Sequence, residues 1–97
     1  MDLLQAVAQP RRREILRLVW DRELSAGQIA ARFDVTFAAV SQHLAVLREA
    51  ELVSVREEGR RRLYRADRTA LRDLRPTLEK MWASKLDRLA ELVDSIE

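Results

Sequence analysis

The chain has 97 residues, of which 47% are hydrophobic and 35% are charged. This is the size of one domain, and the apolar fraction excludes an intrinsically disordered chain. Cysteine is absent and histidine occurs once, which excludes disulfides, thiolate chemistry and clusters of cysteine or histidine metal ligands. No apolar run reaches the roughly 18 residues of a membrane-spanning helix, and the N-terminus lacks a secretory signal. We therefore expect a soluble, cytoplasmic protein with no metal, no cofactor and no membrane partner.

The charge is unevenly distributed along the chain. The net charge of +2, from 18 basic and 16 acidic residues, is too small to indicate nucleic-acid binding by itself. Residues 1–55 are neutral, residues 56–75 carry eight arginines against four acids, and residues 76–97 have two more acids than bases. Arginine binds phosphates and base edges well, because its planar guanidinium presents two donors at once. The arginine-rich segment therefore makes nucleic acid a candidate partner.

Turn and capping residues divide the chain into helices followed by a hairpin. We expect helices over residues 2–9, 10–23, 26–33 and 37–49, with Pro10 at a first helical position and with Ser25 and Thr36 as N-caps. Alternating apolar residues then predict two strands, 52–56 and 61–66, joined by a turn at Gly59. The remainder, to residue 97, is predicted to be helical, with apolar residues three or four positions apart. Pro76 is expected to separate a short helix from the long final one, because the residue before a proline disfavours helical geometry.

This order of elements defines the expected fold. Two short helices joined by a three-residue turn and followed by a β-hairpin form a winged helix-turn-helix. We therefore expect a mainly α fold with a small β-hairpin, in which residues 1–97 make one DNA-binding domain.

The helix over residues 37–49 has the pattern of a DNA recognition helix. Phe37, Val40, Leu44 and Leu47 form one stripe that we expect to be buried. The opposite face is small and polar and consists of Ala38, Ser41, Gln42, Ala45 and Arg48, flanked by Ala39 and His43. Small side chains allow the helix to approach a major groove, Gln42 can pair with adenine, and Ser41 and Thr36 suit bases or phosphates. The alternative is an ordinary amphipathic helix with a solvated face.

The hairpin places three consecutive arginines just after its turn. Arg60, Arg61 and Arg62 are expected at the tip of the wing, where they can contact the DNA backbone or the minor groove. The alternative is a hairpin kept soluble by its charges. Glu57 and Glu58 would be repelled by phosphate, so they either point away or pair with the arginines.

Several further residues have two interpretations each. His43 contacts DNA or makes a structural hydrogen bond, since no second residue at a suitable spacing makes it a metal ligand or catalytic base. The arginines at positions 11–13 either touch phosphate or begin a solvated helix with internal salt bridges. Trp20 and Trp82 are expected to pack, with a small-molecule site at Trp82 as the alternative.

Several segments together resemble the ArsR family of bacterial winged-helix repressors. They are AVAQPRRREIL, ELSAGQIAARF, VSQHLAVLREAELV and GRRRLYR, and the tail MWASKLDRLAEL is similar to metal-independent members of the SdpR-like autorepressor type. The resemblance implies a homodimer on a palindromic operator in double-stranded DNA, often at its own promoter, with contacts from residues 36–48 and the wing. It also implies a dimer interface from the first and last helices, formed by Leu3, Leu4, Val7, Leu78, Met81, Trp82, Leu86 and Leu89.

The chain departs from the family pattern at three places. Ser25, Ala26 and Gly27 stand where metal-sensing members have cysteines, and the last helix has no histidine, so metal sensing at those sites is excluded. Gln9 replaces an aspartate that caps the next helix. Glu51 replaces a glycine that ends the recognition helix, so we expect either strain or a different helix ending.

These observations predict a sequence-specific transcriptional repressor. Two recognition helices of a dimer, about 34–36 Å apart, would occlude a promoter. The alternative is a winged-helix module that binds an acidic protein partner. An enzyme is not expected, because the sequence offers no nucleophile–base pair, metal set or phosphate-binding loop.

Overall fold

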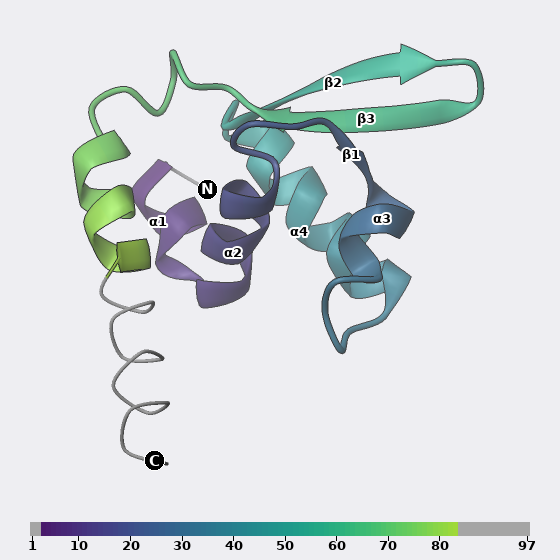
Figure 1. Cartoon of the computed structure of the whole chain (residues 1–97), viewed down its shortest axis with the longest axis horizontal. Helices are drawn as coiled ribbons and strands as arrows, with labels where there is room; N and C mark the ends of the chain where they lie inside the picture. The colour runs from purple at the N-terminus through teal and green to yellow at the C-terminus, as the bar shows by residue number, and fades with distance from the viewer. Residues whose placement is uncertain (1–2, 84–97) are drawn as a thin grey trace, which may run out of the picture.

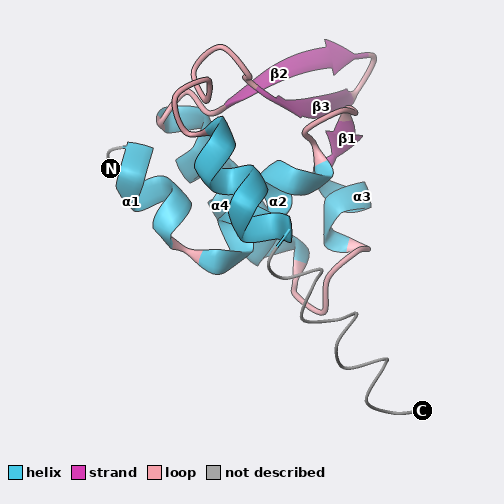
Figure 2. Ribbon diagram, turned by 60° about the vertical axis from the view of Figure 1, so that its left-hand side comes forward, coloured by secondary structure: helices cyan, strands magenta, loops and turns pink. Residues whose placement is uncertain are grey.

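Helices and short strands follow the predicted order in the computed structural model, which describes residues 3–83. The elements are α1 (Leu3–Ala8), α2 (Pro10–Leu18), β1 (Leu24–Ser25), α3 (Ala26–Ala30), α4 (Phe37–Glu49), β2 (Val53–Glu58) and β3 (Arg61–Ala66). Residues 75–83 are also helical. The helices lie together on one side of the hairpin, which extends away from them as the wing (Figures 1 and 2). This confirms the winged helix-turn-helix fold.

Side chains begin the helices where the sequence predicts. The Thr36 hydroxyl accepts from the Ala39 amide at 3.1 Å, and Ser25 and Gln28 form a reciprocal capping box at the start of α3. Gln9 caps α2, because its Oε1 accepts from the Arg12 amide at 2.8 Å. An amide oxygen thus takes the place of the family carboxylate, and Pro10 occupies the first helical position.

The sheet has one more strand than the sequence predicts. The strands lie in the order β1-β3-β2 and all pairs are antiparallel, with Leu24 opposite Tyr64 and Val55 on the other side of Tyr64. The chain turns after Leu18 to form β1, so α2 is shorter than expected. The α-helical part of α3 also ends early, at Ala30, where the following amides bond to carbonyls three residues back.

The core lies between the helices and the base of the hairpin. In the described part of the chain every buried side chain is apolar. Val40, Leu44 and Leu47 of α4 are at most 1% exposed, and they pack in one cluster with residues of α2, α3 and β2. Phe37 is not part of this stripe, contrary to the prediction, because it is 60% exposed. One face of α4 is therefore buried in the core, and the opposite face is exposed to solvent.

The segment before Pro76 consists of turns and is not the expected short helix. The Asp67 carboxylate accepts from the amides of Thr69 and Ala70, and the amide of Leu74 bonds to the carbonyl of Leu71 three residues back, as in a tight turn. Residue 75 is already helical, so Pro76 lies in the first turn, where its missing N–H is tolerated. Leu71 and Leu78 are buried, at 0% and 2% exposure, and anchor this segment on the core.

Glu51 ends α4 in the left-handed conformation that usually requires glycine. Its φ is 62°, the amide of Glu51 bonds to the carbonyl of Arg48, and the amide of Leu52 bonds to that of Leu47. These two bonds are those of a Schellman motif. The left-handed helix ending that the resemblance implies is therefore present, although the residue is not glycine. The sequence left open strain or a different helix ending, and the structure shows the first of these.

Replacing Glu51 by glycine should stabilise the protein. Glu51→Gly removes the strain of a left-handed residue, which outweighs the extra freedom of the unfolded chain, so we expect a gain of about 1 kcal/mol in the free energy of unfolding. Urea denaturation measures it. The matched control is Glu49→Gly, in the helical last residue of α4, which should destabilise; a Glu51→Gly protein no more stable than wild type would contradict the assignment.

Candidate nucleic-acid interface

The outer face of α4 is open to solvent. Of the predicted contact residues, seven are exposed: Thr36, Ala38, Gln42, Arg48, Arg60, Arg61 and Arg62. Ala39, Ser41 and His43 are half-buried. The Thr36 hydroxyl already accepts the capping bond, so it has its proton left to donate. The helix thus presents a small, polar and basic surface along its length.

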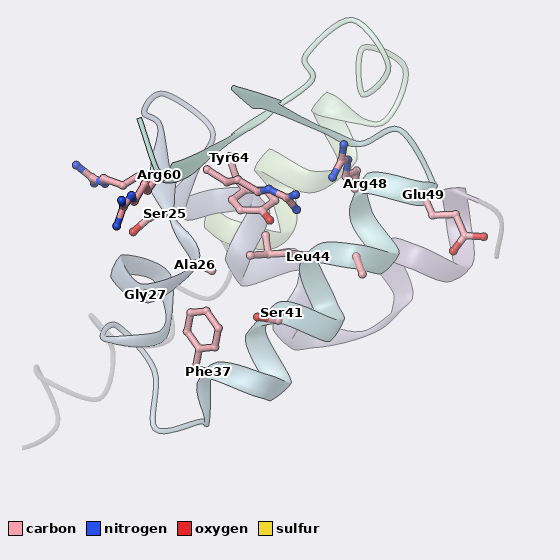
Figure 3. A pocket seen from close by; sticks show the side chains of 13 residues that line it. Ser25, Ala26, Gly27, Phe37, Ser41, Leu44, Arg48, Glu49, Arg60 and Tyr64 are labelled. Atoms are coloured by element: carbon pink, nitrogen blue, oxygen red, sulfur yellow. The ribbon is translucent and has the colours of Figure 1, made fainter. Parts of the chain in front are cut away.

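A groove of about 800 Å³ lies between α4 and the wing. It is lined by Phe37, Ser41, Leu44, Ala45, Arg48 and Glu49 of α4, by Ser25, Ala26 and Gly27 at the start of α3, and by Arg60, Arg61, Arg62 and Tyr64 of the wing. Figure 3 shows the Phe37 ring and the Ser41 side chain directed into this α4–wing groove. Ser41, Arg48 and the three wing arginines are therefore brought to one surface, whereas Gln42, Ala38 and His43 lie outside the lining.

Among the residues of the α4–wing groove that sequence reasoning misses are its two aromatic side chains, Phe37 and Tyr64. The spacing of Phe37 fits the buried stripe and predicts a core position. Phe37 is instead 60% exposed and lines the groove together with Ala26 and Gly27 at the start of α3. Tyr64 is absent from the predicted contacts, although strand alternation places it on the same face as Arg62, and this pattern is the signal that could have found it.

Ion pairs engage two of the arginines of the wing, Arg56 and Arg62. Arg56 forms a two-bonded pair with Glu23, at 2.9 and 3.1 Å, and also contacts Glu58 at 2.9 Å. The Arg56 hydrogen bonds hold the pKa of Glu23 below its usual value. Glu57 lies 3.8 Å from Arg62. The two glutamates thus pair with arginines, one of the two arrangements that the sequence allowed.

The wing tip contacts the helix-turn-helix through one side chain. Arg61 donates to Gln28 Oε1 at 3.2 Å, and the same oxygen accepts from the Ser25 amide at the start of α3. Gly59, with a φ of 63°, makes the two-residue turn. Arg60 has no hydrogen bond or ion pair to any residue in the range 3–83, so it is available for an anionic partner.

The arginines at the start of α2 serve the fold. Arg12 Nε donates to the carbonyl of Ala6 at 2.7 Å, and Arg13 Nη1 donates to those of Val7 and Ala8 at 2.9 Å. These carbonyls end α1 and lack helical partners. Arg11 lies 4.7 Å from the centre of the Phe33 ring. The structure thus supports the internal role for this triplet.

His43 lies on the flank of α4. Burial lowers its pKa, and the nearby charges of Arg12 and Arg11 lower it further. The imidazole is therefore neutral at pH 7, so any hydrogen bond that it makes to DNA comes from an uncharged ring.

The residues expected at a dimer interface fall into two groups. Leu4 and Met81 are 65% and 46% exposed, and Leu3, Val7 and Trp82 are half-buried. Leu78, in contrast, is 2% exposed, so it belongs to the protomer core and has almost no surface left for a partner. Leu86 and Leu89 lie outside the described residues.

Trp82 packs within the protomer. Its ring meets that of Trp20 edge-on, with centroids 5.3 Å apart and an interplanar angle of 77°. This contact ties residues 75–83 to the segment that follows α2. The sequence predicts a packing role for Trp82 but places it at the dimer interface.

Metal-ligand clusters and membrane-spanning helices are both absent from the described part of the chain. Residues 3–83 hold no group of three or more histidine, aspartate or glutamate side chains arranged to bind a metal ion. Over the same range, no helix combines the length and the apolar character needed to cross a bilayer.

Comparisons with known proteins agree with this geometry. The model of a family described as bacterial regulatory protein, arsR family, matches residues 9–55. The transcriptional regulator Rv2034 of Mycobacterium tuberculosis is 42% identical over 91 residues, which are 94% of this chain and 85% of that protein. The transcriptional repressor SdpR of Bacillus subtilis is 33% identical over 72 residues, covering 76% and 80% of the two chains.

A third relative has a solved structure. The transcriptional activator HlyU of Vibrio cholerae is 36% identical over 80 residues, which are 82% of this chain and 74% of HlyU. Its structure matches with a TM-score of 0.74 and covers 84% of this chain and 88% of that one. Both the fold and a substantial part of the sequence are therefore shared with transcriptional regulators.

The lowered pKa of His43 predicts a loss of stability in acid. The unfolded chain binds this proton more readily than the folded one, so stability present above pH about 6.5 falls as the pH is lowered through that value. Thermal unfolding of wild type and His43→Gln between pH about 7.5 and 5.5 tests this. As the pH is lowered, the variant should lose less stability than wild type. The matched control Glu23→Gln removes a group that titrates at lower pH; equal pH dependence in wild type and His43→Gln would contradict the assignment.

Proposed function

The chain belongs to the ArsR family of bacterial regulatory proteins and is a DNA-binding transcriptional regulator; on this basis we propose that it is a homodimeric repressor of a palindromic operator. The observation that carries the proposal is the α4–wing groove, where Ser41 and Arg48 share one surface with the wing arginines. A recognition helix supplies base contacts, and arginines supply phosphate or minor-groove contacts. Neither kind of contact requires a catalytic group, in keeping with a regulator that is not an enzyme.

Base and phosphate contacts would come from different parts of this surface. Gln42 projects from the exposed face of α4 and is suited to adenine, since its amide offers a donor and an acceptor together. Ser41 and Arg48 line the groove beside the wing and suit bases or phosphates. Ala38 and Ala39 contribute only small side chains to the first turn, beside Phe37. The wing arginines would contact the DNA phosphates next to the bases that the recognition helix meets, and these contacts would not depend on the DNA sequence.

Repression would come from occupying the promoter. SdpR is named as a repressor, and the matching tail favours the same role here, including repression of the chain's own promoter. HlyU is named as an activator, which makes activation the second candidate. The two roles share the DNA contacts and differ in where the operator lies relative to the polymerase site.

Independence from metals is part of the proposal. The Ser25 hydroxyl, where metal-sensing members have a thiolate, accepts from the Gln28 amide at 3.2 Å to start α3. A neutral hydroxyl engaged in a helix cap is a poor ligand for soft metals. The site would thus serve folding and not sensing.

The test is binding to the DNA upstream of the chain's own gene. Fluorescence anisotropy should show tighter binding to this region than to random duplex, with affinity falling as salt rises. Transcription in vitro from the same fragment should decrease on adding the protein. An equal affinity for random DNA would contradict the specific-regulator proposal, and an increase in transcription would favour the activator.

Two sets of substitutions should separate base contacts from phosphate contacts. Gln42→Ala should lose about 1–3 kcal/mol of discrimination between the operator and a single-base variant. Replacing Arg60, Arg61 and Arg62 together by alanine should weaken all duplexes similarly and reduce the slope of log affinity against log salt by about 0.9 for each phosphate that is no longer neutralised. If the arginine triple changed specificity and left the salt slope unaltered, the assignment of the wing to phosphates would be wrong.

The dimer proposal rests on the two exposed apolar side chains near the ends of the described chain. Burying Leu4 and Met81 against a second copy would remove apolar surface from water, and a glutamate at either position would have to be desolvated. Light scattering should show that Leu4→Glu and Met81→Glu shift a wild-type dimer to monomer and weaken operator binding. Lys80→Glu is the matched control, one residue from Met81; a wild type that is monomeric at every concentration would contradict the proposal.

A further inference from the structure

Phe37 is unusual among the apolar residues of this protein. In residues 3–83 three large hydrophobic side chains are exposed, namely Leu4, Phe37 and Met81. Leu4 and Met81 lie on the first and last helical segments, away from the recognition helix. Phe37 alone lies on the recognition helix, with 60% of its surface in water.

The backbone holds the ring at the leading end of the helix. Phe37 is the first residue of α4, directly after the Thr36 cap, whose hydroxyl fixes the first turn by accepting from the Ala39 amide. Figure 3 shows the ring directed into the α4–wing groove, on the side that also carries Ser41. The N-terminal residues of a recognition helix are those that meet base edges.

The surroundings leave the ring free to contact DNA. The residues near it on the outer surface are small: Ala38 comes next in the helix and is exposed, and Ser41 and Ala45 follow along the groove. The arginines of the groove stand farther along, at Arg48 and on the wing. A duplex held by those arginines through its phosphates would therefore bring base edges, and not phosphates, to the first turn of α4.

From this arrangement we propose that Phe37 determines specificity by packing on the 5-methyl group of a thymine in each half-site. Thymine is the one base that presents a methyl group in the major groove, and apolar side chains are its usual contacts there. The contact would remove the exposed ring from water, which explains why an aromatic residue is tolerated at this position. The inference rests on the proposed binding of α4 in the major groove and adds the base that Phe37 selects.

The experiment removes the methyl group and the ring separately. The probe is the tightest-binding duplex that the wild-type protein selects from a random library, with each thymine replaced in turn by deoxyuridine, which lacks only the methyl group. At one thymine or more in each half-site, wild type should lose affinity about fourfold, the change expected for one buried methyl. Phe37→Ala should bind the thymine duplex more weakly and lose nothing further on the deoxyuridine duplex.

Two control proteins make the result specific. Gln42→Ala should keep the full deoxyuridine effect, because an amide that pairs with adenine does not sense a thymine methyl. Phe37→Leu keeps an apolar side chain and should retain part of the effect, with circular dichroism confirming that each variant folds.

The outcomes separate this inference from the function on which it rests. If a preferred duplex is recovered but deoxyuridine acts equally on wild type and Phe37→Ala, or on neither, the role of Phe37 is overturned while specific binding stands. Recovery of no preferred sequence overturns both.

Discussion

The junction at Leu52 is the interaction on which the arrangement of the binding surface depends. Its amide bonds to the carbonyl of Leu47 at the end of α4, its carbonyl accepts from the amide of Asp67 just after β3, and its side chain is fully buried. Recognition helix and wing are thereby joined through one residue. The left-handed turn at Glu51 is required for this geometry, because without it the chain would continue past α4 and the hairpin would not fold back over the groove.

The strain at Glu51 therefore lies at the junction between the recognition helix and the wing. A non-glycine residue with a φ of 62° costs stability, and the two backbone bonds of the turn and the burial of Leu52 offset that cost. A further contact between the wing and the rest of the protein is the ion pair of Arg56 with Glu23, which is partly exposed to solvent and contributes little to stability. It joins β2 to the residue directly before β1. The buried contacts of Leu52 thus fix the point at which the wing begins, and the ion pair of Arg56 with Glu23 contributes to the orientation of the wing.

Much of this fold was predictable from local sequence rules, and the errors have physical causes. The bounds of α4 follow from Thr36 and the apolar stripe, and β3 from the turn at Gly59. β1 escapes prediction because two residues are too few to show alternation; it exists only through pairing with β3. The prediction for Phe37 is wrong because helical spacing gives the face of a helix but does not say what covers that face. Leu78 is buried within its own protomer although the sequence groups it with the dimer interface, because a stripe does not say whether it meets its own protomer or another.

The candidate site divides in the same way. The exposed face of α4 and the arginines of the wing follow from periodicity and from the hairpin turn. That Ser41 and Arg48 share a groove with the wing depends on tertiary contacts, among them Arg61 with Gln28. The net charge of +2 likewise conceals this grouping, since Glu57 and Glu58 beside the turn are paired with arginines while Arg60 in the turn has no partner in residues 3–83.

We propose that α4 and the wing of two protomers contact one operator symmetrically. Hydroxyl-radical footprinting of the protein on the DNA upstream of its gene tests this most directly. Symmetric binding by a dimer should give two protected patches on one face of the duplex, related by the palindrome and a whole number of helical turns apart, about 34–36 Å for one turn. Removal of the wing arginines should shorten the outer edge of each patch. A single unrepeated patch, or uniform protection along the fragment, would contradict it.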